Sequence, residues 1–253
     1  MNPAGRDEPA VAPPASLALP VDRLVQPDDV SCGPTSMAMV CRFHGDRLGI
    51  SEAMASIERN EDGGTLAVHI GRAALLRGYG VRIWTWNLRL FDPSWHELPR
   101  AALLAKVRAR RRVASRAKAR YALGAYARFL AAGGEVAFAE LERQLLVDVL
   151  ARRRPLLVGL SATYLYGTPR EDPRTNQPDD VGGEPVGHFV VISGYEDHGR
   201  RFAVVDPMAD SPLGPHGERV VDATRLLNAV LLGQITYDAV LLEMWPAGET
   251  TSS

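Results

Sequence analysis

The stretch that most restricts the fold is residues 187–207, GHFVVISGYEDHGRRFAVVDP. It contains two apolar runs, and residues 196–199 between them are turn-like and end in glycine. Two apolar runs joined by a short turn predict an antiparallel β-hairpin, because neighbouring strands then pair without a crossover. We therefore expect an antiparallel sheet in the C-terminal half of the chain.

Helical patterns come mainly before this hairpin, and strand patterns come mainly around and after it. The predicted helices cover residues 31–44, 51–58, 65–78, one or two segments within 98–134, 138–154 and 222–233. The predicted strands cover residues 20–25, 81–88, 156–166, the hairpin, 219–221 and 237–245. This order favours an α+β fold in which the sheet packs against the helix that begins at Cys32.

Length and composition indicate one globular domain. The chain has 253 residues, of which 46% are hydrophobic and 23% charged, and its formal net charge is −1. This balance gives no overall attraction to nucleic acid or membranes, and no apolar run approaches the roughly 20 residues of a membrane span. We expect a disordered leader at 1–19, a single domain at 20–246 and a flexible tail at 247–253.

The chain has two cysteines, Cys32 and Cys41. On one helix this separation turns them through about 900°, which places the thiols on opposite sides and argues against a disulfide. Free thiols, and an N-terminus without the apolar stretch of a signal peptide, favour the cytoplasm. Cys41 lies among apolar residues and is predicted to be a small buried side chain. No close Cys or His cluster is present, so we expect neither a metal site nor a cofactor.

Cys32 lies where a polar loop becomes an apolar helix, in the stretch QPDDVSCGPTSMAM at 26–39. The dipole and N–H groups of a helix N-terminus favour the thiolate, which is the nucleophilic form of cysteine. Gln26 has a side-chain amide that can hold a developing oxyanion together with the backbone N–H of Cys32. The pattern predicts Cys32 as a nucleophile and Gln26 as its oxyanion donor.

A cysteine nucleophile needs a base, usually histidine, and that base needs an orienting partner. His188 stands apart among six histidines because it opens the first strand of the hairpin. A turn centred near residue 197 or 198 places residues 206–208 opposite His188, so Asp206 is predicted to contact its ring. Structural or solvent-facing roles are predicted for the other five: His44, His69, His96, His198 and His216.

Two further segments are candidates for substrate binding. Residues 167–187 form a long run rich in Pro, Gly and Asp, and such a loop within a compact domain is usually functional or disordered. Tyr164 and Tyr166 precede this loop and Gly187 ends it, so these residues are expected to line the cleft. Asp29 either supplies a charge that the helix dipole favours or recognises a basic or amino group.

Residues 98–134 have an unusual composition. They contain ten lysines and arginines, no aspartate and no glutamate, with alanine and leucine between. The pattern predicts a basic helical insert of one or two amphipathic helices. Its charged side is either a solvated face or an electrostatic docking surface for an acidic peptide or protein. A nucleic-acid partner is disfavoured because no recognised binding motif accompanies the charge.

The stretches QPDDVSCGPTSMAMV and GHFVVISGYEDHGRRFAVVDP resemble the papain-like bacterial cysteine peptidases of family 39. That family includes the bacteriocin leader peptidases that cut after double glycine. The pattern T-x-x-x-x-I-G-x-x-A at 65–74 is also similar to it, so the resemblance covers most of residues 20–245. The insert at 98–134 and the loop at 167–187 depart from the compact family pattern.

The resemblance implies a stand-alone member with a papain-like fold and a peptide substrate. It implies Cys32 as nucleophile, His188 as base, Asp206 as orienting residue and Gln26 as oxyanion donor. The leading hypothesis is a thiol-dependent peptidase or amidase that works through an acyl-enzyme. An acyltransferase or transpeptidase would use the same residues with an amine acceptor in place of water. A second alternative is a peptide-binding protein that keeps the fold without catalysis.

Overall fold

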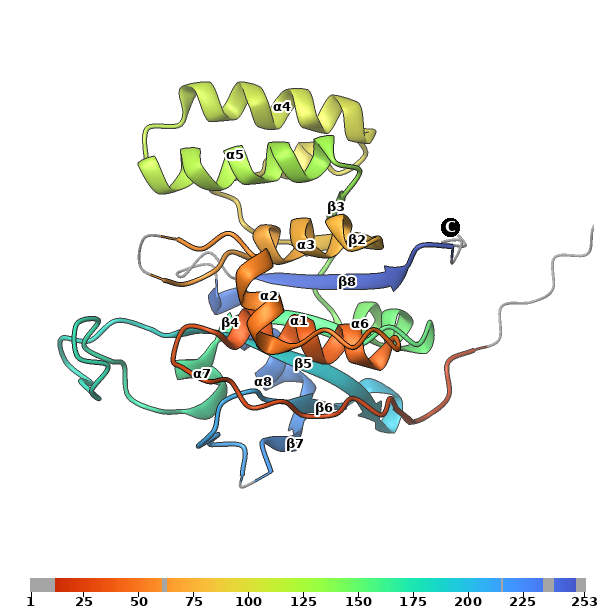
Figure 1. Cartoon of the computed structure of the whole chain (residues 1–253), viewed down its shortest axis with the longest axis vertical. Coiled ribbons are helices and arrows are strands. Elements are labelled where there is room, and N and C mark those ends of the chain that lie inside the picture. The colour runs from red at the N-terminus through yellow and green to blue at the C-terminus, as the bar shows by residue number, and fades with distance from the viewer. Residues whose placement is uncertain (1–11, 61–62, 215, 234–238, 249–253) are drawn as a thin grey trace, which may run out of the picture.

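Figure 1 shows the computed structural model, which describes residues 12–60, 63–214, 216–233 and 239–248. The first eleven residues of the expected leader lie outside the described residues, as does the expected tail beyond residue 248. Within these ranges, no helix combines the length and the apolar character that crossing a bilayer requires.

The described chain forms a mixed α+β fold, as the order of the sequence patterns predicted. Its α-helices are α1 (Cys32–Phe43), α2 (Ile50–Ser56), α3 (Ala67–Leu76), α4 (Arg100–Val113), α5 (Ala117–Ala131), α6 (Arg143–Ala151), α7 (Ala162–Tyr166) and α8 (Ala223–Leu232). Its strands are β1 (Leu17–Ala18), β2 (Tyr79–Thr85), β3 (Glu135–Ala137), β4 (Leu156–Ser161), β5 (Gly187–Glu196), β6 (Arg201–Val205), β7 (Glu218–Asp222) and β8 (Val240–Pro246). The predicted hairpin is present as β5 and β6, and the predicted helix after the loop begins at Cys32.

The strands form one sheet in the order β3-β2-β8-β4-β5-β6-β7, with β1 paired to β5. Neighbouring strands are antiparallel except β2 and β3, which are parallel. Strands β4, β5 and β8 are buried along almost their whole length. Their sequences are mostly apolar, whereas β2 alternates between buried and half-buried residues.

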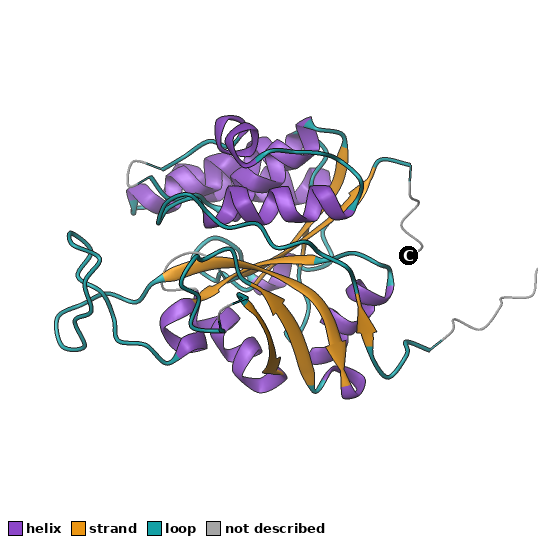
Figure 2. Ribbon diagram, turned by 60° about the horizontal axis from the view of Figure 1, so that its bottom comes forward, coloured by secondary structure: helices purple, strands orange, loops and turns teal. Residues whose placement is uncertain are grey.

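Helices cover both sides of the sheet, as Figure 2 shows. Helix α1 packs on β5 and β4, α3 packs on β2 and β8, and α8 packs on β4. Helices α4 and α5 form the predicted basic insert, a helical hairpin that contacts α3 through α5 and stands at one end of the molecule (Figure 1). The layered packing buries apolar side chains and holds α1 against the strand that begins next to His188.

Two details of the sheet correct the sequence-based expectations. Residues 162–166 form the short helix α7 and do not continue the strand, because the Ser161 hydroxyl accepts a hydrogen bond from Tyr164 N and caps a helical turn. The sheet is also not confined to the C-terminal half. Strand β2 enters it beside β8, and β3 then joins β2 in parallel.

The disordered leader expected at residues 1–19 does not extend to residue 19. Strand β1 pairs with the end of β5 that extends beyond β4. The backbone N–H of Leu19 donates to the carbonyl of Ser193 at 2.7 Å, and the Leu19 side chain is buried in the core. These residues are ordered because they pair an otherwise open strand edge and bury an apolar side chain.

Candidate active site

The candidate nucleophile, Cys32, is the first residue of α1 and is half-buried. Ser31 precedes the helix, but its hydroxyl donates to the carbonyl of Asp28 and makes no capping bond to the first turn. Pro34 lies within that first turn, where its missing N–H removes no helical hydrogen bond. The amide of Cys32 thus lies at a helix end that favours negative charge and can receive an oxyanion.

A hydrogen bond and a close contact hold α1 against β5, the strand that contains His188. The hydroxyl of Ser36 donates to the backbone carbonyl of Phe189 at 3.2 Å. Gly33 leaves room for the Phe189 ring, since a Cβ at this position would lie 3.2 Å from Phe189 Cδ2 and 2.9 Å from Ile70 Cδ1. Glycine directly after Cys32 therefore allows the thiol and the imidazole to approach each other.

The structure brings His188 and Asp206 into contact. Nε2 of His188 lies 2.8 Å from Oδ1 of Asp206, and the exposed fractions of the two side chains are 4% and 0%. The register differs in detail from the expected one, because Val191 pairs with Val205, and its continuation sets Asp206 beside residue 190. Asp206 thus reaches the ring from a diagonal position across the two strands.

Four donors hold the carboxylate of Asp206. Besides His188, the phenol of Tyr166 donates to Oδ2 at 2.6 Å, the Ser211 hydroxyl donates to Oδ2, and the amide of Met208 donates to Oδ1 at 2.9 Å. Burial alone would raise the pKa of Asp206, but the hydrogen bonds and the charge of His188 lower it below the usual range. Burial and the Asp206 charge also raise the pKa of Tyr166, so that its phenol remains a donor.

His188 is the charged centre of the site. Burial alone would lower its pKa, but the negative charge of Cys32 and the hydrogen bond to Asp206 outweigh burial and raise the pKa to about 10. A side-chain hydrogen bond with Cys32 acts in the same direction. Since Nε2 is held by Asp206, Nδ1 is the ring nitrogen left for Cys32. A protonated imidazole beside a cysteine favours the thiolate over the thiol.

Gln26 lies in the loop before α1, and its side chain is buried. Its Nε2 donates to the carbonyl of Asp28 at 2.8 Å, which leaves the second amide hydrogen for another acceptor. Its backbone N–H donates to the carbonyl of Pro207 at 2.8 Å. Arg23 also donates from Nε to the carbonyl of Asp206 at 2.7 Å. These bonds join the segment before Cys32 to the segment that contains Asp206.

Asp29 lies beside the long loop at 167–187. Nδ2 of Asn176 donates to its carboxylate at 3.4 Å. Burial, and then the charge of Asp29, raise the pKa of Glu171 in the same loop. Figures 1 and 2 show the loop reaching out from the body of the molecule beside α7. The loop therefore borders the segment that leads to Cys32, and its role as a cleft wall stays a prediction.

The other residues expected in the cleft have different surroundings. Gly187 pairs with Ser161 across β4 and β5 and directly precedes His188. Tyr164 faces α8: its ring lies 5.3 Å from the guanidinium carbon of Arg225, which also donates to its carbonyl. The residue that contacts the site is Tyr166, whose ring packs edge-on to His188 at 6.3 Å.

Sequence reasoning missed the role of two residues beside Asp206. Tyr166 was expected only as part of the cleft wall, and Ser211 was not considered. Ser211 follows Asp206 by five residues in a loop, and its hydroxyl turns back to the carboxylate. Nothing in the pattern of this stretch indicates that turn. Tyr166 lies on α7. Because these residues were predicted as a strand, the direction of the Tyr166 side chain could not be predicted.

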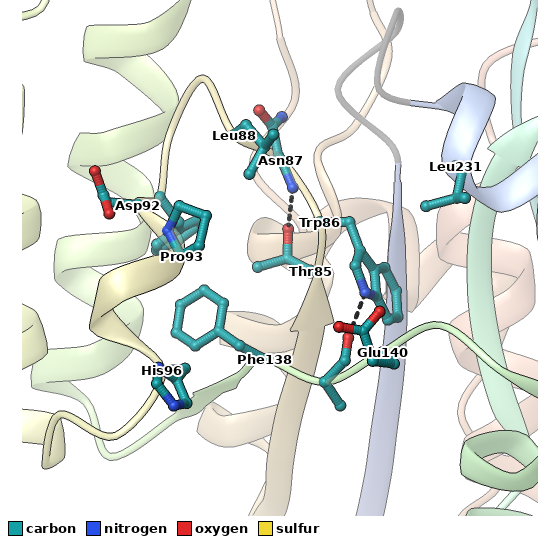
Figure 3. Close-up of a pocket in the computed structure, with 12 residues that line it drawn as sticks. Thr85, Trp86, Asn87, Leu88, Asp92, Pro93, His96, Phe138, Glu140 and Leu231 are labelled. Atoms are coloured by element: carbon teal, nitrogen blue, oxygen red, sulfur yellow. Dashed lines mark hydrogen bonds between the residues drawn. The ribbon is translucent and has the colours of Figure 1, made fainter.

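A separate cavity of about 520 Å³ lies where β2 ends, at the end of the sheet where β5 begins (Figure 3). Its walls are largely apolar and include Trp86, whose Nε1 donates to the carbonyl of Ala139 at 2.6 Å. Thr85 at its edge lies on β2, and the strand order sets β8 and β4 between β2 and β5. Among the described residues, none of the predicted site residues lines this cavity. It is therefore distinct from the site around Cys32.

Comparison with known proteins gives likenesses only among solved structures; no family model and no curated protein matches the chain. The chain is similar to the peptidase domain of Streptococcus ComA, a bi-functional ABC transporter (14% identity, 89% of this chain and 98% of that chain, TM-score 0.45). It is also similar to a putative C39-like peptidase from Bacillus anthracis (14%, 91% and 97%, TM-score 0.45). A third likeness is to xylellain, a cysteine protease from Xylella fastidiosa (14%, 93% and 87%, TM-score 0.49). These likenesses concern the course of the chain only.

We expect His188 to remain protonated at neutral pH and to lose its proton near pH 10, as measured by NMR on histidine-labelled protein. The substitution Cys32→Ala should lower the pKa of His188, because it removes a raising charge while burial still acts to lower the pKa. The substitution Asp206→Asn should also lower it. A His188 titration that neither substitution changes would contradict the geometry described above.

We also expect iodoacetamide to alkylate Cys32 at neutral pH and to leave Cys41 unmodified in the folded protein. Cys41 is fully buried, and burial raises its pKa to about 12, so its thiolate is scarce. Peptide mapping by mass spectrometry identifies the modified residue. Protein unfolded in urea serves as the control in which both thiols react. Equal labelling of the two thiols in the folded protein would be inconsistent with the structure.

Proposed function

We propose that this protein is a cysteine peptidase or amidase that cleaves an amide bond through a thioester on Cys32. The observation that carries the proposal is the buried contact of His188 with Asp206, which leaves the second ring nitrogen toward Cys32. Burying a charged pair costs desolvation energy, and such a pair behind a thiol favours a chemical role over passive binding. The fixed orientation of the imidazole is the property that a general acid and base needs.

In the first half of the reaction, the Cys32 thiolate attacks the carbonyl carbon of the substrate amide. The carbonyl oxygen becomes an oxyanion, which the Cys32 N–H and the free amide hydrogen of Gln26 stabilise. The protonated His188 gives its proton to the amide nitrogen as the carbon–nitrogen bond breaks. The amine leaves, and the acyl group stays on Cys32 as a thioester.

In the second half, the now neutral His188 accepts a proton from a water molecule that attacks the thioester. The carbon–sulfur bond breaks, the acid product leaves and the Cys32 thiolate is restored beside the protonated His188. Asp206 stays ionised throughout and stabilises the imidazolium. Tyr166 and Ser211 keep the carboxylate in place, since each holds Oδ2 while Oδ1 accepts from His188.

The substrate of this reaction is proposed to be a peptide, which approaches Cys32 alongside the segment at Asp29 and the loop at 167–187. The contact between Asn176 and Asp29 supports this path, since it sets the loop beside the approach to Cys32. Residues 20–246 are proposed to work as one domain, and β1 extends its sheet by pairing with β5. The two free thiols, Cys32 and Cys41, favour the reducing environment of the cytoplasm.

The proposal is tested by incubating the full chain with a proteome-derived peptide library and identifying new peptide ends by mass spectrometry. We expect cleavage by the unmodified protein and by Cys41→Ala, and none by Cys32→Ala or His188→Ala. Cys41→Ala is the matched control, because it removes the other thiol from the same helix. Products that carry an added amine would assign acyl transfer instead, and the absence of any product with correctly folded protein would favour peptide binding without catalysis.

Tyr166 is expected to act as a positioning residue. The substitution Tyr166→Phe removes one hydrogen bond of about 1 to 1.5 kcal/mol from Asp206, so kcat should fall roughly tenfold while KM stays unchanged. Tyr164→Phe is the control two residues earlier on the same helix, where the hydroxyl has only a 3.5 Å contact with Asn228. Equal effects of the two substitutions on kcat would rule out the assigned role of Tyr166.

A further inference from the structure

Four arginines line one cavity between α4 and α5. The cavity measures about 570 Å³, and its lining residues are Arg108, Arg111, Arg112, Arg120 and Tyr121. Arg111 and Arg112 lie one turn after Arg108 on the same side of α4, and Arg120 lies in the first turn of α5. We call this feature the arginine cleft. Its volume is in the range of sites that bind a small ligand or a few residues of a peptide.

The charge of the arginine cleft is not neutralised from within. No carboxylate lines it, and residues 98–134 contain no aspartate or glutamate. Among the described ion pairs, none includes any of the four arginines. Gathering four like charges in one cavity is unfavourable, and a bound anion relieves that repulsion.

Two of the guanidinium groups are held in place by the insert itself. Arg120 donates from one nitrogen to the carbonyls of Ala114 and Ser115, at 3.0 and 2.7 Å, in the turn between the helices. Arg111 lies against Gly124 of α5, where a Cβ would be 3.2 Å from its Nε. Positions that are fixed before binding reduce the entropy that a ligand must overcome. Guanidinium forks in this setting suit carboxylate groups, which they bind with two parallel hydrogen bonds.

A row of contacts leads from the arginine cleft toward Cys32. Tyr121 also lines a second cavity of about 550 Å³, whose wall includes Asn60. The amide of Asn60 donates to the carbonyl of Gly64 in the turn that follows α2. In that turn, Gly63 lies against Val30, with 3.7 Å between its ideal Cβ position and Val30 Cγ2. Val30 is two residues before Cys32, so this turn connects the wall of the second cavity with the segment that leads to the site.

We infer that the arginine cleft binds an acidic segment of the peptide substrate, at several residues from the bond that is cleaved. The inference rests on the proposed function and adds the class of side chain by which a substrate is selected. Aspartate and glutamate carboxylates pair with the arginines, while the extended chain follows the second cavity toward Cys32. The resulting selectivity is electrostatic, and it weakens as ionic strength rises.

Binding is tested with fluorescein-labelled hexaglutamate and the full chain, by fluorescence anisotropy at low and at high salt. We expect binding at low salt that weakens with added salt, and much weaker binding of labelled hexaglutamine. The triple substitution of Arg108, Arg111 and Arg112 to Gln should weaken hexaglutamate binding roughly tenfold or more, since three ion pairs are lost and each exposed pair contributes up to about fivefold.

A matched triple variant controls for net charge. Arg47, Arg200 and Arg201 are exposed, lie beyond the far end of α1 and at the β5–β6 turn, and are replaced by Gln together. This variant should bind hexaglutamate like the unmodified protein. Equal loss of binding in the two triple variants overturns the inference. Tripolyphosphate or a single-stranded oligonucleotide that binds the cleft more tightly than hexaglutamate also overturns it, in favour of a phosphate ligand.

The experiment separates this inference from the proposed function. Binding is measured again with Cys32→Ala, which should bind hexaglutamate unchanged, because the cleft does not include the thiol. In the peptide-library digest, acidic residues should be enriched on one side of the cleaved bonds, and the Arg108/Arg111/Arg112 variant should lose that enrichment. Cleavage without charge-dependent binding overturns the inference alone, whereas binding without any cleavage overturns only the peptidase proposal.

Discussion

The contact between His188 and Asp206 is the interaction on which the rest of the site depends. A buried carboxylate is stable only when its oxygens are satisfied, and Asp206 is satisfied by donors from β5, α7 and its own loop. That loop is in turn joined to the segment before Cys32 through Gln26 and Arg23. Loss of the carboxylate would therefore disturb the imidazole, the helix α7 and the approach to the nucleophile together.

The sequence was most informative where function requires a local pattern. Counting residues outward from the predicted turn of the hairpin located the contact between His188 and Asp206, although Asp206 reaches the ring from a diagonal position. The start of α1 was also found, because a polar loop followed by glycine, proline and an apolar run marks a helix N-terminus. The roles of both residues in catalysis remain predictions, as does that of Gln26.

The sequence was less informative where long-range packing decides the outcome. Residues 162–166 read as a strand because they are apolar, yet the Ser161 cap turns them into α7 and sets Tyr166 beside Asp206. The end of the expected leader is ordered because it pairs with an edge of β5, and the sequence does not reveal that edge. Ser211 contacts Asp206 only because its loop folds back. Each of these outcomes depends on partners that no local pattern specifies.

The basic insert illustrates how a fold gains a second surface without altering its centre. Helices α4 and α5 rest on α3 and add no residue to the contact between His188 and Asp206. Their arginines nevertheless face a cavity whose neighbour leads back to the turn against Val30. Under the two proposals, selectivity and chemistry belong to separate parts of the chain, so that one can vary while the other is kept.

The hydrogen bond between Ser36 and Phe189 joins residues that are 153 positions apart. On the ribosome, at roughly 5 to 20 residues per second, the thiol of Cys32 emerges about 8 to 30 s before His188, the histidine that is proposed to activate it. During that interval the nascent chain carries an ordinary cysteine and has no means of attacking its own amide bonds or those of its neighbours. The long sequence separation therefore acts as a safeguard in time, since reactivity arises only after nearly the whole domain has been synthesised.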